Sequence, residues 1–347
     1  MKRIDRIGFF NGLRSGSESG FSRREFIVAG TTLAFGLIPT TLTRAEEKRS
    51  TKGGFVPPNA DKRRKAIGSL AGLSPQLKRA FDPDEHFEAL PAPEPGEWLA
   101  EHPEKGQTFD QFVASRSSRP DARRSTIYLV PFGDFDAEWS PKMSDLEACA
   151  SAFFQITVKS LPPCPLDNKQ FTTRENSGKR QYLSTDFLRH LPTLLPADGF
   201  AILGITMQDL YPDPAWNYVF GQASLRDRAG IYSFARYDPL FRGKKRTADE
   251  KESLLLRSLG VLLHETGHMF GMAHCIYYRC LMNGANNLEE SDKQPMHLCP
   301  ICLRKLHHSV GFNIVTRYES LLQEYERLEI KEEAEWLEKR LKFLRNG

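Results

Sequence analysis

Three histidines and one glutamate stand at spacings that could hold a metal ion. The run that begins at His264 reads HETGHMFGMAH. In a helix, His264 and His268 lie four residues apart on one face, so both imidazoles can reach one ion. Glu265 lies beside them, where its carboxylate can reach a water molecule bound to that ion more easily than the ion itself. Gly271 permits a turn with positive φ, and His274 then follows as a third ligand.

The full pattern HExxHxxGxxH carries more information than its first half. HExxH alone also occurs on ordinary amphipathic helices, but the glycine and the third histidine at fixed offsets make chance a poor explanation. Three neutral imidazoles leave a zinc ion its double charge and an open fourth position, which lowers the pKa of a bound water toward neutrality. We therefore expect Glu265 to accept the proton of the water that attacks a substrate carbonyl, and to deliver it to the leaving group.

Four cysteines form a second candidate metal site directly after the third histidine. They occur as a CxxxxC pair and a CPIC pair, at Cys275, Cys280, Cys299 and Cys302. Such pairs beside a metal-binding helix favour a closed tetrahedral zinc site, which would be structural and would hold the loop that carries His274. Disulfides are the alternative, because six cysteines would also suit two or three disulfides in an exported protein. Cys149 and Cys164 stand apart, either as small buried hydrophobes or as a pair.

Together these motifs resemble those of the metzincin metallopeptidases, and most closely those of the archaemetzincins. That family combines a catalytic metal site with a four-cysteine zinc site, although its pattern is often written with one more residue before the last CxxC. The resemblance implies two zinc ions, one catalytic and one structural, and peptide or protein substrates. It also implies aminopeptidase-like activity, but no residue here identifies a site for an N-terminal amine. Met282 resembles the methionine that forms an apolar floor below the metal, a position that simple core packing would also explain.

Two other classes of protein could use the same residues. A non-catalytic zinc protein could bind a peptide or partner on this scaffold, but such a protein has no reason to keep Glu265 beside the metal. A zinc finger that binds nucleic acid would need a basic surface. The formal charge of +4 over 347 residues comes entirely from residues 1–45, which hold seven Lys/Arg and three Asp/Glu, while the remainder has 41 of each sign. We therefore expect no nucleic-acid partner.

The first 45 residues resemble a twin-arginine export signal. Arg23 and Arg24 precede a weakly apolar run at residues 26–42, which is marginal in length for a membrane span. We expect cleavage near Ala45 and export to the periplasm or the medium. An uncleaved anchor and a cytoplasmic tail are the alternatives, and the anchor would be the only membrane contact. Because this route carries folded proteins, zinc could be loaded before export.

Four segments follow from composition and periodicity. Residues 1–45 form the signal, 46–124 a linker and an N-terminal extension, 125–312 the catalytic domain with the four-cysteine site, and 313–347 a C-terminal amphipathic helix. Residues 46–65 are predicted to be linker, and a short helix is expected at 108–116. The chain is expected to be monomeric. The fold class is α/β (α+β), with a metzincin-like mixed sheet, an active-site helix and a small C-terminal helical subdomain.

The expected elements of the catalytic domain alternate between strands and helices. Strands are predicted at 126–135, 155–161, 199–207 and 216–220, and helices at 141–154, 184–195, 249–270 and 303–310, with an exposed loop at 162–179. Ser184 is the predicted N-cap of its helix. If residues 216–220 form the edge strand above the cleft, as the family resemblance implies, their free backbone groups could bind an extended peptide by strand addition. An ordinary edge strand with aromatic side chains in the core is the alternative.

Overall fold

The structure is a computed structural model that describes residues 6–9, 54–166 and 169–346. The predicted export signal therefore lies outside the described residues, apart from Arg6–Phe9. Among the residues that are described, no helix has the length and apolar character needed to cross a membrane.

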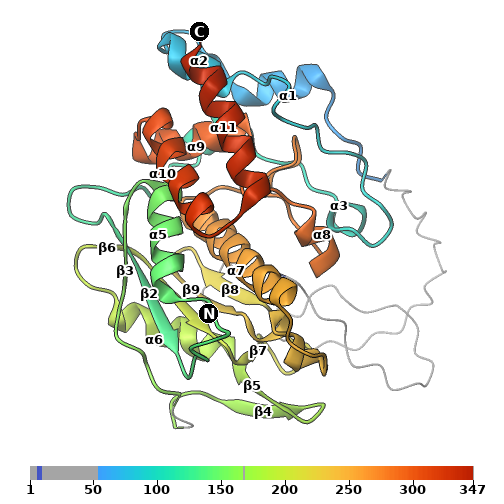
Figure 1. Cartoon of the computed structure of the whole chain (residues 1–347), viewed down its shortest axis with the longest axis vertical. Coiled ribbons are helices and arrows are strands. Elements are labelled where there is room, and N and C mark those ends of the chain that lie inside the picture. Colours follow the sequence, from blue (N-terminus) through green and yellow to red (C-terminus); the bar gives the residue numbers. More distant parts are fainter. Residues whose placement is uncertain (1–5, 10–53, 167–168, 347) are drawn as a thin grey trace, which may run out of the picture.

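A six-stranded mixed sheet confirms the predicted fold class (Figure 1). Its strand order is β1-β8-β9-β6-β2-β3. The four strands β9, β6, β2 and β3 run parallel, whereas β8 pairs antiparallel with β9 and β1 pairs antiparallel with β8. Their bounds are β1 Arg6–Phe9, β2 Thr126–Phe132, β3 Thr157–Ser160, β6 Gly199–Thr206, β8 Gly221–Ser224 and β9 Ala229–Ser233. Because β2 and β6 are buried throughout, they appear in the sequence as continuous apolar runs.

A small three-stranded sheet includes part of the segment 162–179, which the sequence predicted to be a loop. It consists of β4 Thr173–Asn176, β5 Lys179–Leu183 and β7 Asp209–Tyr211. The loop prediction is wrong for β4, because Ser177 and Gly178 both take positive φ and form a two-residue hairpin between β4 and β5. Two central residues with positive φ are the requirement of a type I′ turn.

The predicted edge strand at 216–220 is also wrong. Only Val219 of that segment makes a β-bridge, to Leu210, and the strand beside the sheet edge begins at Gly221. The carbonyl oxygen of Asn217 accepts hydrogen bonds from the side chains of Arg174 and Gln181, at 2.9 and 2.8 Å. Side chains have therefore replaced the backbone partner that a strand would have there, and the outer edge of β8 is paired with β1.

Helices cover both faces of the six-stranded sheet. On one face lie α5 Met143–Phe154 and α7 Ala248–Met269, and on the other α6 Ser184–Leu194 (Figure 1). All three were predicted to within a few residues. Ser184 is the first residue of α6 and not its N-cap, which is Leu183, because the Ser184 hydroxyl donates to Gln222 Oε1 at 2.6 Å. Two short 3-10 helices, Ala235–Tyr237 and Pro239–Arg242, connect β9 to α7.

The C-terminal part contains two helices where one was predicted. They are α10 Ile314–Arg327 and α11 Lys331–Arg345, and they pack against each other. The chain reverses direction at Glu329, which takes a φ of 59°. The sequence has no glycine or proline at this point that would have predicted the turn. Before them come α8 Leu288–Asp292 and α9 Pro300–Val310.

The N-terminal extension packs on these C-terminal helices at the top of the molecule (Figure 1). Its helices are α1 Ala60–Ile67, α2 Pro75–Phe81, α3 Trp98–Glu101 and α4 Phe109–Ala114. The linker prediction is wrong from residue 60 onward, because these residues form helix α1. Asn59 caps this helix, and the last two residues of the helix are buried. Helices α1, α2 and α4 all contact α9, and α2 also contacts α11, so the N-terminal extension and the C-terminal helices share one layer.

Candidate metal centres and active site

Helix α7 places the first two predicted ligands on one face. His264 and His268 lie in its last two turns with their Nε2 atoms 3.0 Å apart. The helix ends at Met269, and Gly271 turns the chain with a φ of 83°, as predicted. This turn brings His274 to the same place, so that one ligand atom from each of the three rings lies within 4.8 Å of the others.

Each of the three imidazole rings is fixed through its Nδ1 atom. The acceptors are the carbonyl oxygens of Leu281 for His264 (2.7 Å) and Met272 for His268 (2.5 Å), and Glu104 Oε1 for His274 (2.8 Å). A ring that donates from Nδ1 presents its Nε2 lone pair for a metal. Burial also lowers the pKa of His264 well below its usual value and that of His268 to about 3, so both rings are neutral, as metal ligands must be.

Glu265 is fully buried beside these ligands. Neither of its carboxylate oxygens has a hydrogen-bond partner within the described part of the chain. Burial alone raises the pKa of this carboxyl to about 8 in the metal-free protein. A buried carboxyl without partners is costly, and a nearby dication together with a water molecule would relieve that cost. The site therefore fits a zinc ion.

Met282 lies beneath the helix turn that carries the two histidines. It is buried, and a Cβ atom added to Gly267 would come within 2.5 Å of its sulfur. The Met282 carbonyl accepts a hydrogen bond from Cys275 N–H at 2.7 Å. Met282 thus packs against the turn of α7 that carries the histidines, which agrees with the apolar floor that the family resemblance implies and equally with simple core packing.

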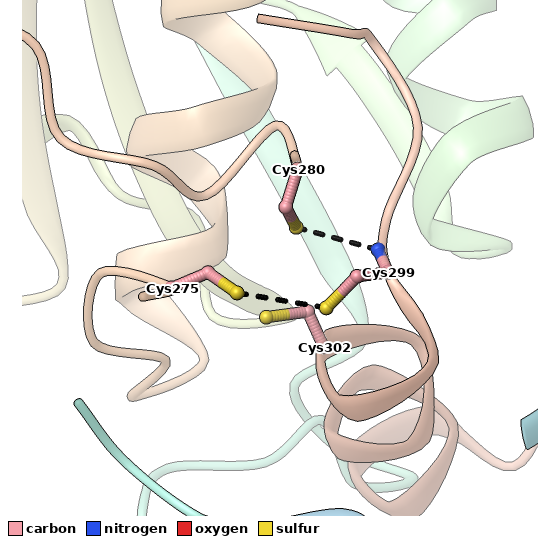
Figure 2. Close-up of side chains that lie close together, drawn as sticks. All are labelled: Cys275, Cys280, Cys299 and Cys302. Atoms are coloured by element: carbon pink, nitrogen blue, oxygen red, sulfur yellow. Dashed lines mark hydrogen bonds between the residues drawn. The ribbon is translucent and has the colours of Figure 1, made fainter. Parts of the chain in front are cut away.

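The four predicted thiolate ligands converge as well. Figure 2 shows Cys275, Cys280, Cys299 and Cys302 with their sulfur atoms turned toward one another. Cys299 is the N-cap of α9 and Cys302 lies in its first turn. The Cys275 and Cys299 sulfurs are 3.6 Å apart, close to the value of about 3.8 Å that a tetrahedral zinc–thiolate site requires. None of the chain's six cysteines, all of which are described, forms a disulfide.

The chemistry of the four thiols also fits zinc. Burial raises the pKa of Cys280 and of Cys299 well above the usual value, and neighbouring thiols add to this for Cys299. Four thiolates in such a site need a dication. Asn283, which the sequence did not single out, organises the loop: its Nδ2 donates to the Cys275 carbonyl at 2.7 Å, and its Oδ1 accepts from Cys280 N–H at 2.8 Å.

A carboxylate from the N-terminal extension reaches the third histidine. Besides His274, Glu104 Oε1 also accepts a hydrogen bond from Trp98 Nε1 at 2.6 Å. Burial acts to raise the pKa of Glu104, but the hydrogen bonds from His274 and Trp98 keep it below the usual value. Sequence reasoning missed Glu104, because no pattern connects residues 170 positions apart.

A cavity of about 760 Å³ adjoins the histidine site. Helix α7 forms one wall from Glu252 to His264, and the segment that includes His297 and the start of α11 forms the other. Gly260 lies on the cavity wall, and a Cβ atom added there would meet nothing within 4 Å. The cavity therefore has room for an additional group next to His264.

Comparison with known proteins places this site in a family. The model of Peptidase family M54 matches residues 187–308, a range that contains all three histidines, Glu265 and the four clustered cysteines. Archaemetzincin-2 of Macaca fascicularis is 39% identical over an alignment of 287 positions, which covers 73% of this chain and 79% of the relative. The chain belongs to the archaemetzincins. It is a zinc-dependent metallopeptidase that acts on peptides or proteins, as the motifs led us to expect.

A further relative and two solved structures are also similar to this chain. Archaemetzincin-2 of Homo sapiens is 38% identical over an alignment of 285 positions, which again covers 73% of this chain and 79% of the relative. Among solved structures, a zinc-dependent peptidase from Methanocorpusculum labreanum is 25% identical with a TM-score of 0.43, and the archaemetzincin of Archaeoglobus fulgidus, complexed with malonate, is 30% identical with a TM-score of 0.39. Each match covers 52% of this chain and 99% of the solved chain.

Proposed function

We propose that this archaemetzincin hydrolyses peptide bonds at a zinc ion held by His264, His268 and His274, with Glu265 as general base. The observation that carries the proposal is the convergence of three oriented imidazoles beside a buried carboxylate that has no hydrogen-bond partner among the described residues. Zinc, when bound, polarises the substrate carbonyl and lowers the pKa of the attacking water. We also propose a second, structural zinc held by Cys275, Cys280, Cys299 and Cys302.

The protein's own groups move the proton. Glu265 accepts it from the attacking water and delivers it to the nitrogen of the leaving amine. Because Glu265 is buried, its carboxylate is shielded from bulk water. The hydrogen bonds at Nδ1 hold the three imidazole rings in their orientation throughout the reaction.

A mixed peptide library tests this function. The wild-type protein and Glu265→Gln, each with its zinc content measured, are incubated with the library, and the fragments are identified by mass spectrometry. Loss of single N-terminal residues would indicate the aminopeptidase mode, and internal cuts an endopeptidase mode. If both proteins hold two zinc ions and are equally inert, the peptidase proposal fails and a non-catalytic peptide-binding role takes its place.

We propose that the cavity beside His264 receives part of the substrate, and Gly260 offers a test. Gly260→Leu should place a side chain in the cavity and lower kcat/KM about 10-fold or more, because the cavity would lose room for substrate. The control Gly260→Ala should keep most activity and raise the free energy of unfolding by about 0.5–1 kcal/mol, because alanine favours a helix. Steady-state kinetics with a cleaved library peptide and thermal melts measure both. Full activity in Gly260→Leu would exclude the cavity as a substrate site.

We propose that the chain is exported in the folded state, on the strength of Arg23 and Arg24 before an apolar run. The full-length chain, produced in a bacterium with a twin-arginine pathway, should appear in the periplasm in a form shortened by about 45 residues. The double substitution Arg23→Lys, Arg24→Lys should leave it in the cytoplasm at full length. Immunoblots of cell fractions distinguish the two locations, and equal distribution of both proteins would contradict export by this route.

A further inference from the structure

His274 differs from the other two histidines in what holds it. His264 and His268 stand on a helix, and their Nδ1 atoms donate to carbonyl oxygens of Leu281 and Met272 nearby in the chain. His274 stands on a loop after Gly271, and its Nδ1 donates to a carboxylate from the N-terminal extension. The orientation of the third ligand therefore depends on a different part of the protein.

Glu104 is itself fixed by Trp98. The indole Nε1–H donates to Glu104 Oε1, and the edge of the indole meets the His274 ring with the ring centres 5.2 Å apart at 84°. The Trp98 backbone N–H donates to both oxygens of Glu290, at 2.9 and 3.0 Å. Gly284 lies against the indole, where an added Cβ would come within 2.5 Å of it. Trp98 is thus fixed on the C-terminal part of the chain.

The loop that carries His274 is held by a second residue of the extension. Gln107 Nε2 donates to the Gly271 carbonyl and Gln107 Oε1 accepts from Ala273 N–H, both at 3.2 Å. Lys305 of α9 donates to the Gln107 carbonyl at 2.6 Å. The extension therefore fixes the backbone of the His274 loop at two points, the Gly271 carbonyl and the Ala273 N–H.

We propose that Glu104 is a positioning residue of the catalytic centre, which orients His274 and gives the N-terminal extension control over zinc affinity. This inference rests on the proposed three-histidine zinc site. A carboxylate that accepts from Nδ1 fixes the ring plane of a ligand histidine and makes its Nε2 a stronger donor, and loss of such a partner costs about 10- to 100-fold in metal affinity.

Three variants test it with zinc alone as the probe. Glu104→Ala should raise the dissociation constant of the catalytic zinc about 10- to 100-fold in chelator competition, while one tightly held zinc remains at the cysteines. Glu104→Gln keeps an oxygen that accepts from Nδ1–H and should lie much closer to the wild type. Glu101→Ala, which removes an exposed carboxylate from the same segment, should bind zinc as the wild type does. Melting temperatures of the zinc-free proteins report on folding.

The possible results separate this inference from the proposed function. If the wild type binds only one zinc, the three-histidine site itself fails. If the wild type binds two and Glu104→Ala binds both equally tightly, Glu104 has no positioning role. If Glu104→Gln is as weak as Glu104→Ala and both zinc-free proteins melt at a lower temperature, Glu104 acts only on folding and the inference is overturned.

Discussion

Replacing Glu265 by glutamine is expected to lower kcat/KM about 10³-fold with both zinc ions still bound. Glutamine has the shape of glutamate but cannot accept the proton of the attacking water, and a positioned general base contributes about 10²- to 10⁴-fold to such a reaction. Because Glu265 is fully buried and its oxygens have no partner within the described residues, the neutral side chain should leave the melting temperature unchanged or raise it. Kinetics with a cleaved peptide, zinc analysis and thermal melts give the three quantities.

A carboxylate elsewhere on the same helix supplies the control. Glu250 lies in the first turn of α7, where it pairs with Arg242 at the surface. Glu250→Gln should keep wild-type kcat/KM, since an exposed ion pair contributes little to stability and nothing to the reaction. Retention of more than a tenth of the activity in Glu265→Gln would show that another group accepts the proton.

Cys299→Ser is expected to lose the proposed structural zinc, to destabilise the fold and to lower zinc occupancy at the histidines as well. A structural zinc contributes about 10 kcal/mol or more to folding, comparable to the whole stability of a typical domain. Cys299 starts α9, on which α1, α2 and α4 pack, and Cys275 follows His274 by one peptide bond. Loss of the thiolate site should therefore release both the extension and the third catalytic ligand.

Zinc per chain from elemental analysis and helix content from circular dichroism measure this effect. Cys164→Ser is the matched control, because Cys164 is partly exposed and stands apart from the thiolate cluster. It should hold two zinc ions and melt within a degree or two of the wild type. A Cys299→Ser protein that is active and still binds two zinc ions would refute the coupling between the sites.

Local patterns in the sequence were sufficient to predict α7 and both ligand groups. Helical spacing puts His264 and His268 on one face, and the turn before His274 requires a glycine with positive φ. The placement of all three histidines was therefore predictable from residues close to them in the sequence. The same holds for β2 and β6, whose burial on both faces is visible as apolar runs.

The errors arose where distant groups decide the structure. Residues 216–220 are rich in aromatics and resemble a strand. The Asn217 carbonyl, however, accepts hydrogen bonds from the Arg174 and Gln181 side chains in place of a backbone N–H of a neighbouring strand. Glu104 was missed because its meaning depends on a histidine 170 residues away. The β4–β5 hairpin differs, since Ser177 and Gly178 are a local turn signal that was available in the sequence.

The hydrogen bonds between the extension and the residues around the His274 loop also affect the order in which the protein folds. The hydrogen bonds of Glu104 to His274 and of Lys305 to Gln107 join residues 170 and 198 positions apart. Contacts at such separations close long loops and form after the local helices and hairpins. The third ligand should therefore become ordered among the last steps of folding, so that a partly folded chain would hold two of its three catalytic histidines in place and remain a weak zinc binder.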